Sequence, residues 1–169
     1  APITQLNGTL VGPSVPGMTA RSVQFTAAVS PGQSPGQQVI EADLALVEPR
    51  GNDPALEQLI GKQLRLVIAG LLDAEKLDLN KLTIRSAGIN GQASGIYGLT
   101  ETPKTSLRYR LAVRDLRPVG ALLGLDASGR FDVDGKLTGS TRTQRIVGHL
   151  VAVDTVINGE PLGAIRLKH

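Results

Sequence analysis

The chain of 169 residues contains no cysteine and no tryptophan, and it has only two phenylalanines and two tyrosines. The absence of cysteine excludes disulfides and thiolate metal sites and leaves the redox compartment open. Since aromatic residues make up only 2% of the chain, any core must be largely aliphatic. The two histidines, His149 and His169, lack the helical spacing of a metal-ligand pair. The sequence therefore predicts no cofactor and no metal.

Concentrated charge and long apolar runs are also missing. The net charge of +3 is spread along the chain, and no basic block with stacking aromatics is present, so we expect no nucleic-acid partner. No apolar run reaches the roughly 18 residues that cross a bilayer. The chain begins almost directly with a strand-like pattern. We therefore expect residues 1–169 to form a single β-rich module, excised from a longer protein.

Sequence signatures of catalysis are absent as well. No phosphate-binding loop, nucleophile elbow or dinucleotide fingerprint occurs. Asp132 and Asp134 share one face of an expected strand, as an acid and base pair would require, but that face is polar and charges there are usually solvated. We therefore expect a protein that is not an enzyme.

Strand-like alternation of apolar and polar residues is present along most of the chain. In "SLRYRLAVRD" the leucines and Tyr109 share one side, whereas Arg108, Arg110 and Arg114 share the other, as in an antiparallel sheet that is wet on one face. Only "RIVGHLVAV" is apolar at both parities, which predicts either burial on both sides or a bulge. The residues expected on the apolar face of the sheet are Leu44, Leu46, Leu64, Leu66, Ile68, Leu82, Ile84, Leu107, Tyr109, Leu111, Val113, Phe131, Val133 and Leu137.

Two short segments have helical signals instead. "DPALEQLIG" offers Asp53 as N-cap, a proline in the first turn and Gly61 as the stop. "RPVGALLG" repeats this plan from Arg117, with Leu122 and Leu123 before the terminating glycine. Each ending is followed by strands. The spacing predicts repeat units that begin near residues 53 and 117.

Glycines recur inside the expected strands in the related stretches "NGTLVG", "NGQASG" and "DGKLTG". Glycine weakens a strand interior, so its recurrence needs a reason. One interpretation is that these residues bend a wide sheet or admit a close approach of another segment; the other is that they mark turns between short strands. The glycines assigned to bending are Gly91, Gly95, Gly129, Gly135 and Gly139.

Taken together, the helix ending in "LIG" or "LLG", the strands, "SGRFDVDGKLTGS" and "INGEPLGAIRL" resemble the TamB C-terminal region of the AsmA-like family of bacterial envelope proteins. The likeness covers most of the chain from about Asp53. It implies a wide, curved, antiparallel-rich sheet folded into a taco-like trough with an apolar interior, plus one or two short helices. The residues expected on the apolar face would line that groove.

The resemblance also implies a function. The protein would be a non-enzymatic part of a periplasmic bridge, anchored in the inner membrane outside this chain. It would carry phospholipid to the outer membrane or assist the assembly of outer-membrane proteins. Its partners would be phospholipid acyl chains or unfolded outer-membrane strands, together with an outer-membrane barrel assembly protein. The alternative is a structural or adhesive β-sandwich, in which two apolar faces pack together and leave no groove.

Overall fold

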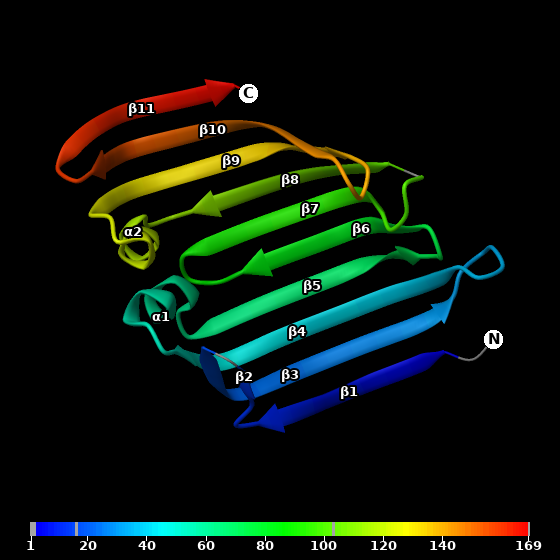
Figure 1. Ribbon diagram of the computed structural model, residues 1–169. Coiled ribbons are helices and arrows are strands. Elements are labelled where there is room, and N and C mark those ends of the chain that lie inside the picture. Colours follow the sequence, from blue (N-terminus) through cyan, green and yellow to red (C-terminus); the bar gives the residue numbers. More distant parts are fainter. Residues whose placement is uncertain (1–2, 16, 103, 169) are drawn as a thin grey trace.

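One antiparallel sheet dominates the computed structural model, which describes residues 3–15, 17–102 and 104–168. Ten of the eleven strands follow one another across the sheet in chain order, and β2 pairs beside this path with β3 (Figure 1). The predicted β-rich fold with two short helices is confirmed. The elements are β1 (Thr4–Val11), β2 (Ser14–Val15), β3 (Met18–Pro31), β4 (Gln38–Gly51), α1 (Pro54–Ile60), β5 (Gln63–Leu72), β6 (Lys76–Arg85), β7 (Ile89–Gly98), β8 (Thr105–Val113), α2 (Arg117–Leu123), β9 (Ala127–Gly139), β10 (Gln144–Ile157) and β11 (Glu160–Lys168).

Both helices begin and end close to where the sequence places them. The Asp53 side chain accepts a hydrogen bond of 2.7 Å from the Ala55 N–H and so caps α1, and Gly61 ends this helix. Gly124 ends α2 in the left-handed conformation that glycine adopts at low cost. Helix α1 precedes β5 to β8, and α2 precedes β9 to β11.

Removing the cap of α1 tests its contribution to stability. We expect Asp53→Ala to lower the free energy of unfolding by about 1 kcal/mol, because one N–H of the first turn loses its acceptor. Chemical denaturation measures this change. Asp53→Asn keeps a side-chain oxygen and should retain most of the stability. Equal losses in the two variants would show that the cap hydrogen bond is not the cause.

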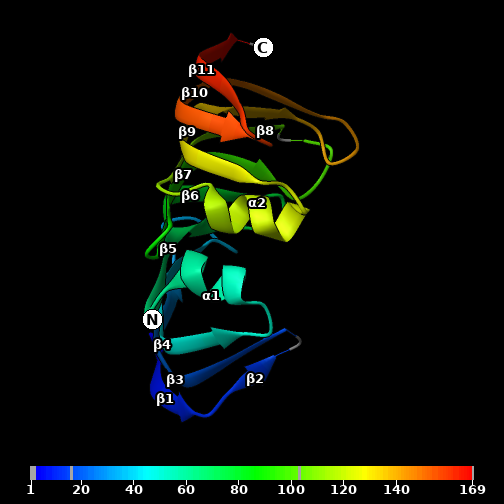
Figure 2. The same cartoon turned by 90° about the vertical axis from the view of Figure 1, so that its left-hand side faces the viewer.

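The hydrophobic core cluster lies at the end of the sheet where the helices lie. Both helices are on the same side of the sheet and contact each other (Figure 2). Here Val113, Leu116 and Ala127 form a buried cluster, against which Val119 and Phe131 pack. The largest part of the sheet has no second layer over it among the described residues.

Helix α2 does not bury the leucines that the sequence suggests. Leu122 and Leu123 are exposed, by 42% and 68% respectively. Pro118 and Gly120 are buried instead, and a Cβ atom at Gly120 would lie 2.7 Å from that of Ala127. The missing side chain thus lets the helix approach β9 closely. Burial in this helix follows the tight contact rather than the largest side chains.

The irregular "RIVGHLVAV" segment is an ordinary strand that runs into a bulge. Its residues pair in regular register with β9 up to Val153. The register then shifts before Val156, and Asp154 adopts a positive φ of 53°. This bulge lies beyond the segment, so it does not explain why residues of both parities within the segment are apolar. Neither interpretation describes the segment itself, because Ile146 and Val147 are exposed and the bulge follows Val153.

Candidate functional site

The apolar face of the sheet is the candidate functional site. Residues paired in register lie on the same face, so cross-strand pairing shows how the predicted apolar residues are arranged. One row joins Leu44, Leu66 and Ile84, passes Gly91, and continues through Leu111 and Val133. All fourteen residues expected on this face belong to such rows. The other pairs are Leu46 with Leu64, Ile68 with Leu82, Leu107 with Leu137 and Val113 with Phe131, and Tyr109 lies opposite Gly135.

Most of this face is only half-buried. Of the fourteen residues, Val113 alone is fully buried, with 4% of its surface exposed, and the other thirteen are intermediate. Val113 is therefore a correction to the expected lining: it lies in the core beneath α2 and is not open to a ligand. Phe131 packs against the same cluster. The open part of the face begins one register row away, at Leu111 and Val133.

Further apolar residues extend the face beyond the expected set, among them Phe25, Ile40 and Leu150. Phe25 of β3 pairs with Leu44, and Leu150 of β10 pairs with Val133, so the row reaches from β3 to β10. Ile40 lies on the same face opposite Gly70. For Phe25 and Ile40, the alternation of apolar and polar residues in their own strands is sufficient to predict that they lie on this face. Leu150 lies in the segment whose parity is ambiguous in the sequence.

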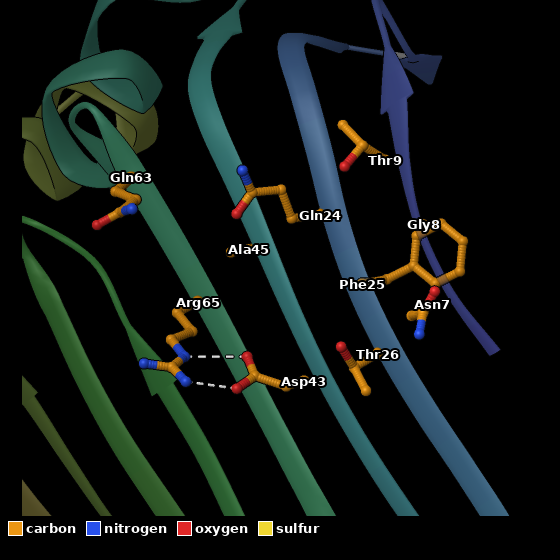
Figure 3. Close-up of a pocket in the computed structure, with 10 residues that line it drawn as sticks. All are labelled: Asn7, Gly8, Thr9, Gln24, Phe25, Thr26, Asp43, Ala45, Gln63 and Arg65. Carbon is orange, nitrogen blue, oxygen red and sulfur yellow. Dashed lines mark hydrogen bonds and ion pairs between the residues drawn. The ribbon is translucent and has the colours of Figure 1, made fainter. Parts of the chain in front are cut away.

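The opposite face of the sheet is polar. A hollow of about 650 Å³ on this face lies over β1, β3, β4 and β5 and is lined mainly by amide, hydroxyl and charged groups (Figure 3). Two hydrogen bonds join the Arg65 guanidinium to the Asp43 carboxylate, and the Nε–Oδ1 distance is 2.9 Å. These bonds hold the pKa of Asp43 below its ordinary value. Because both side chains are well exposed, the pair adds little stability.

Histidine and acidic side chains come near each other on this polar face. His149 Nδ1 lies 4.0 Å from an oxygen of Asp134, which is itself exposed. Among the described residues, no group of histidine, cysteine, aspartate and glutamate is placed to hold a metal ion. In the same part of the chain, no helix has the length and apolar character needed to span a membrane.

The five glycines assigned to bending lie within or at the end of strands, in three kinds of place. Gly95 and Gly129 have positive φ angles of 119° and 104° and lie beside shifts in the register of the ladder. At Gly91 and Gly135 the φ angle is ordinary, but neighbouring groups occupy the space of a side chain. A Cβ atom at Gly135 would lie 2.4 Å from the Val147 carbonyl oxygen and 2.7 Å from Tyr109 Oη. Gly139, with a φ of 129°, is the last residue of β9.

Comparisons with known proteins return no match: no family model, no curated protein and no solved structure is similar to this chain. The function must therefore be argued from the open apolar face, the polar face opposite and the helices that close one end.

Proposed function

We propose that the apolar face binds lipid acyl chains, and that the protein is a non-enzymatic lipid-binding module of the bacterial periplasm. In this proposal the sheet curves into a trough whose interior is the apolar face. The observation that carries it is the partial exposure of that face: thirteen of the fourteen expected lining residues are half-buried, and none of them is fully exposed. Leaving so much apolar surface open is costly in water unless a ligand covers it.

The total exposed area supports the same proposal. A compact globular protein of 17.7 kDa exposes about 8,000 Å². This chain exposes 10,938 Å². The excess of roughly 3,000 Å² is what a single sheet without a covering layer produces. The sandwich alternative requires two packed sheets, whereas the described residues form one.

The energetics favour a continuous apolar surface over a single pocket. Removing an acyl chain of about 16 carbons from a bilayer costs on the order of 13 kcal/mol, at roughly 0.8 kcal/mol per methylene. A carrier must bury a comparable area at every step of the transfer. Ten successive strands spaced about 4.8 Å apart extend for roughly 45 Å, which gives such a surface. The aliphatic lining matches the chemistry of the chain it would hold.

The resemblance to the TamB C-terminal region supports a proposed role for this activity in the cell envelope. The protein would then form part of a bridge that is anchored in the inner membrane and guides phospholipid to the outer membrane. Unfolded strands of outer-membrane proteins are an alternative client, because they also present alternate apolar side chains. An outer-membrane barrel assembly protein would be the partner at the far end.

Fluorescence quenching by brominated lipids tests the proposal directly. The chain has no tryptophan, so a single introduced tryptophan reports on its own surroundings. We expect phospholipid with brominated acyl chains to quench Leu111→Trp and Leu137→Trp strongly, because both positions lie on the apolar face. The matched variant Arg110→Trp, one position away on the polar face, should be quenched little. Similar quenching at all three positions, or none, would contradict a face-specific acyl site.

A further inference from the structure

The first strand of the sheet leaves one edge open. β1 lies at the margin of the sheet and pairs only with β3 among the described elements (Figure 1). Its sequence, "TQLNGTLV", contains no charged residue and no proline, the features that usually protect an edge from pairing. Leu6 and Leu10 are more than half exposed, at 59% and 55%. The opposite edge is better protected, because β11 begins with Glu160 and Pro161 and its register with β10 is irregular.

The direction of the free backbone groups in β1 follows from one hydrogen bond. The N–H of Gly12, the residue directly after β1, donates to the carbonyl of Arg21 over 2.9 Å, and this pair continues the register of Val11 with Ser22. In an antiparallel ladder such hydrogen-bonded pairs recur at every second residue. Even-numbered residues of β1 therefore bond to β3. The backbone N–H and C=O groups of Gln5, Asn7, Thr9 and Val11 point away from the sheet.

We propose that β1 pairs antiparallel with β1 of a second copy of this chain, with the two Gly8 residues facing each other on the dyad. Asn7 then lies opposite Thr9 of the second copy, and these residues exchange backbone hydrogen bonds. Leu6 lies opposite Leu10 of the second copy in a non-hydrogen-bonded pair, where side chains approach most closely. The apolar faces of both sheets stay on the same side. This pairing does not depend on what the apolar face binds.

Local packing selects this register. The Phe25 ring lies against Gly8, and a Cβ atom at Gly8 would be 2.8 Å from its Cζ atom, so the dyad carries no side chain of its own (Figure 3). A slip by one residue would place the apolar side chains of one copy on the polar face of the other. The neighbouring registers that keep both apolar faces on the same side no longer pair Leu6 with Leu10. In those registers each leucine lies opposite a glycine or a threonine. Since β1 is uncharged, no like charges oppose the pairing.

Cysteine cross-linking tests the register, because the native chain has no cysteine. We expect a mixture of the single variants Asn7→Cys and Thr9→Cys to form a disulfide-linked heterodimer under mild oxidation. Opposed residues of a hydrogen-bonded pair are about 5.5 Å apart at Cα, within the range of a disulfide. Each variant alone should remain mainly uncross-linked, because two copies of the same residue lie diagonally and further apart. Efficient cross-linking of either variant alone would overturn the register.

Charge substitutions test the edge itself. We expect Asn7→Lys/Thr9→Lys to be monomeric at concentrations where the native chain sediments as a dimer. Each introduced lysine would lie opposite a lysine of the second copy, and the like charges would repel. The matched control Gln24→Lys/Thr26→Lys adds the same charge on the same face one strand inward, at the register partners of Thr9 and Asn7. It should remain dimeric. A native chain that is monomeric throughout, or a control that dissociates equally, would overturn the proposal.

Discussion

The variant Leu111→Arg is expected to lose acyl-chain binding while the sheet remains folded. Leu111 is half-buried in the central row of the apolar face, opposite Gly91, where the side chains of Ile84 and Leu111 itself already fill the space beside the backbone. A guanidinium there would deprive a bound chain of contact with about three methylenes. This corresponds to roughly 2–3 kcal/mol, or about 30- to 150-fold in affinity. The arginine can still direct its charge to water, so the free energy of unfolding should change little.

Two neighbouring substitutions are the controls for this experiment. Val113→Arg, two residues further along the same strand, would place a charge in a position only 4% exposed. It should therefore lower the free energy of unfolding by about 3 kcal/mol or more. Arg110→Leu changes the polar face and should leave both binding and stability nearly unchanged. Titration with a fluorescent acyl lipid and a denaturation curve for each variant measure the two effects. Unfolding by Leu111→Arg, or unaltered binding, would contradict an open acyl site.

Photo-crosslinking in cells extends the same comparison to the native lipid. A photoreactive side chain at Leu111, Val133 or Leu137 should capture phospholipid, whereas one at Arg110, Asp132 or Lys136 should not. The two sets differ by one position in each strand and thus face opposite sides of the sheet.

The sequence predicts the faces of this sheet well because the alternation is local. Each of Leu44, Leu66, Leu111 and Val133 has a charged neighbour on at least one side, and this indicates its side of the strand without reference to other strands. The sequence signals for the two helices are equally local, since Asp53 and the closing glycines lie within a few residues of the helices that they delimit.

Burial that depends on contacts between distant residues could not be predicted from the local sequence pattern. Val113 shows no difference from Leu111 in its strand pattern, but α2 returns over it and buries it. The exposure of Leu122 and Leu123 has the same origin, because a close contact between Gly120 and Ala127 sets the orientation of α2. Such contacts join segments whose approach is set by the whole sheet.

The variant Gly129→Ala is expected to be among the most destabilising single-methyl changes in the protein. Gly129 has a φ of 104°, which side chains rarely adopt, and it lies at the bulge between β9 and β10. An added Cβ would also lie 2.5 Å from the Asp154 carbonyl oxygen and 2.8 Å from Thr155 Cα. Backbone strain and overpacking each cost about 1–3 kcal/mol. We therefore expect the free energy of unfolding to fall by roughly 3–4 kcal/mol.

Two other glycines separate these contributions. Gly124→Ala has the positive φ of 70° but no atom within 4 Å of the added Cβ, so it should cost only about 1 kcal/mol. Gly135→Ala has an ordinary φ but meets the Val147 carbonyl oxygen at 2.4 Å, so it reports crowding without that strain. Chemical denaturation of the three variants gives the comparison. If the glycines served only as flexible turns, Gly129→Ala would cost no more than Gly124→Ala. A larger loss at Gly129 and Gly135 would instead show that close approach between strands is what requires glycine inside this sheet.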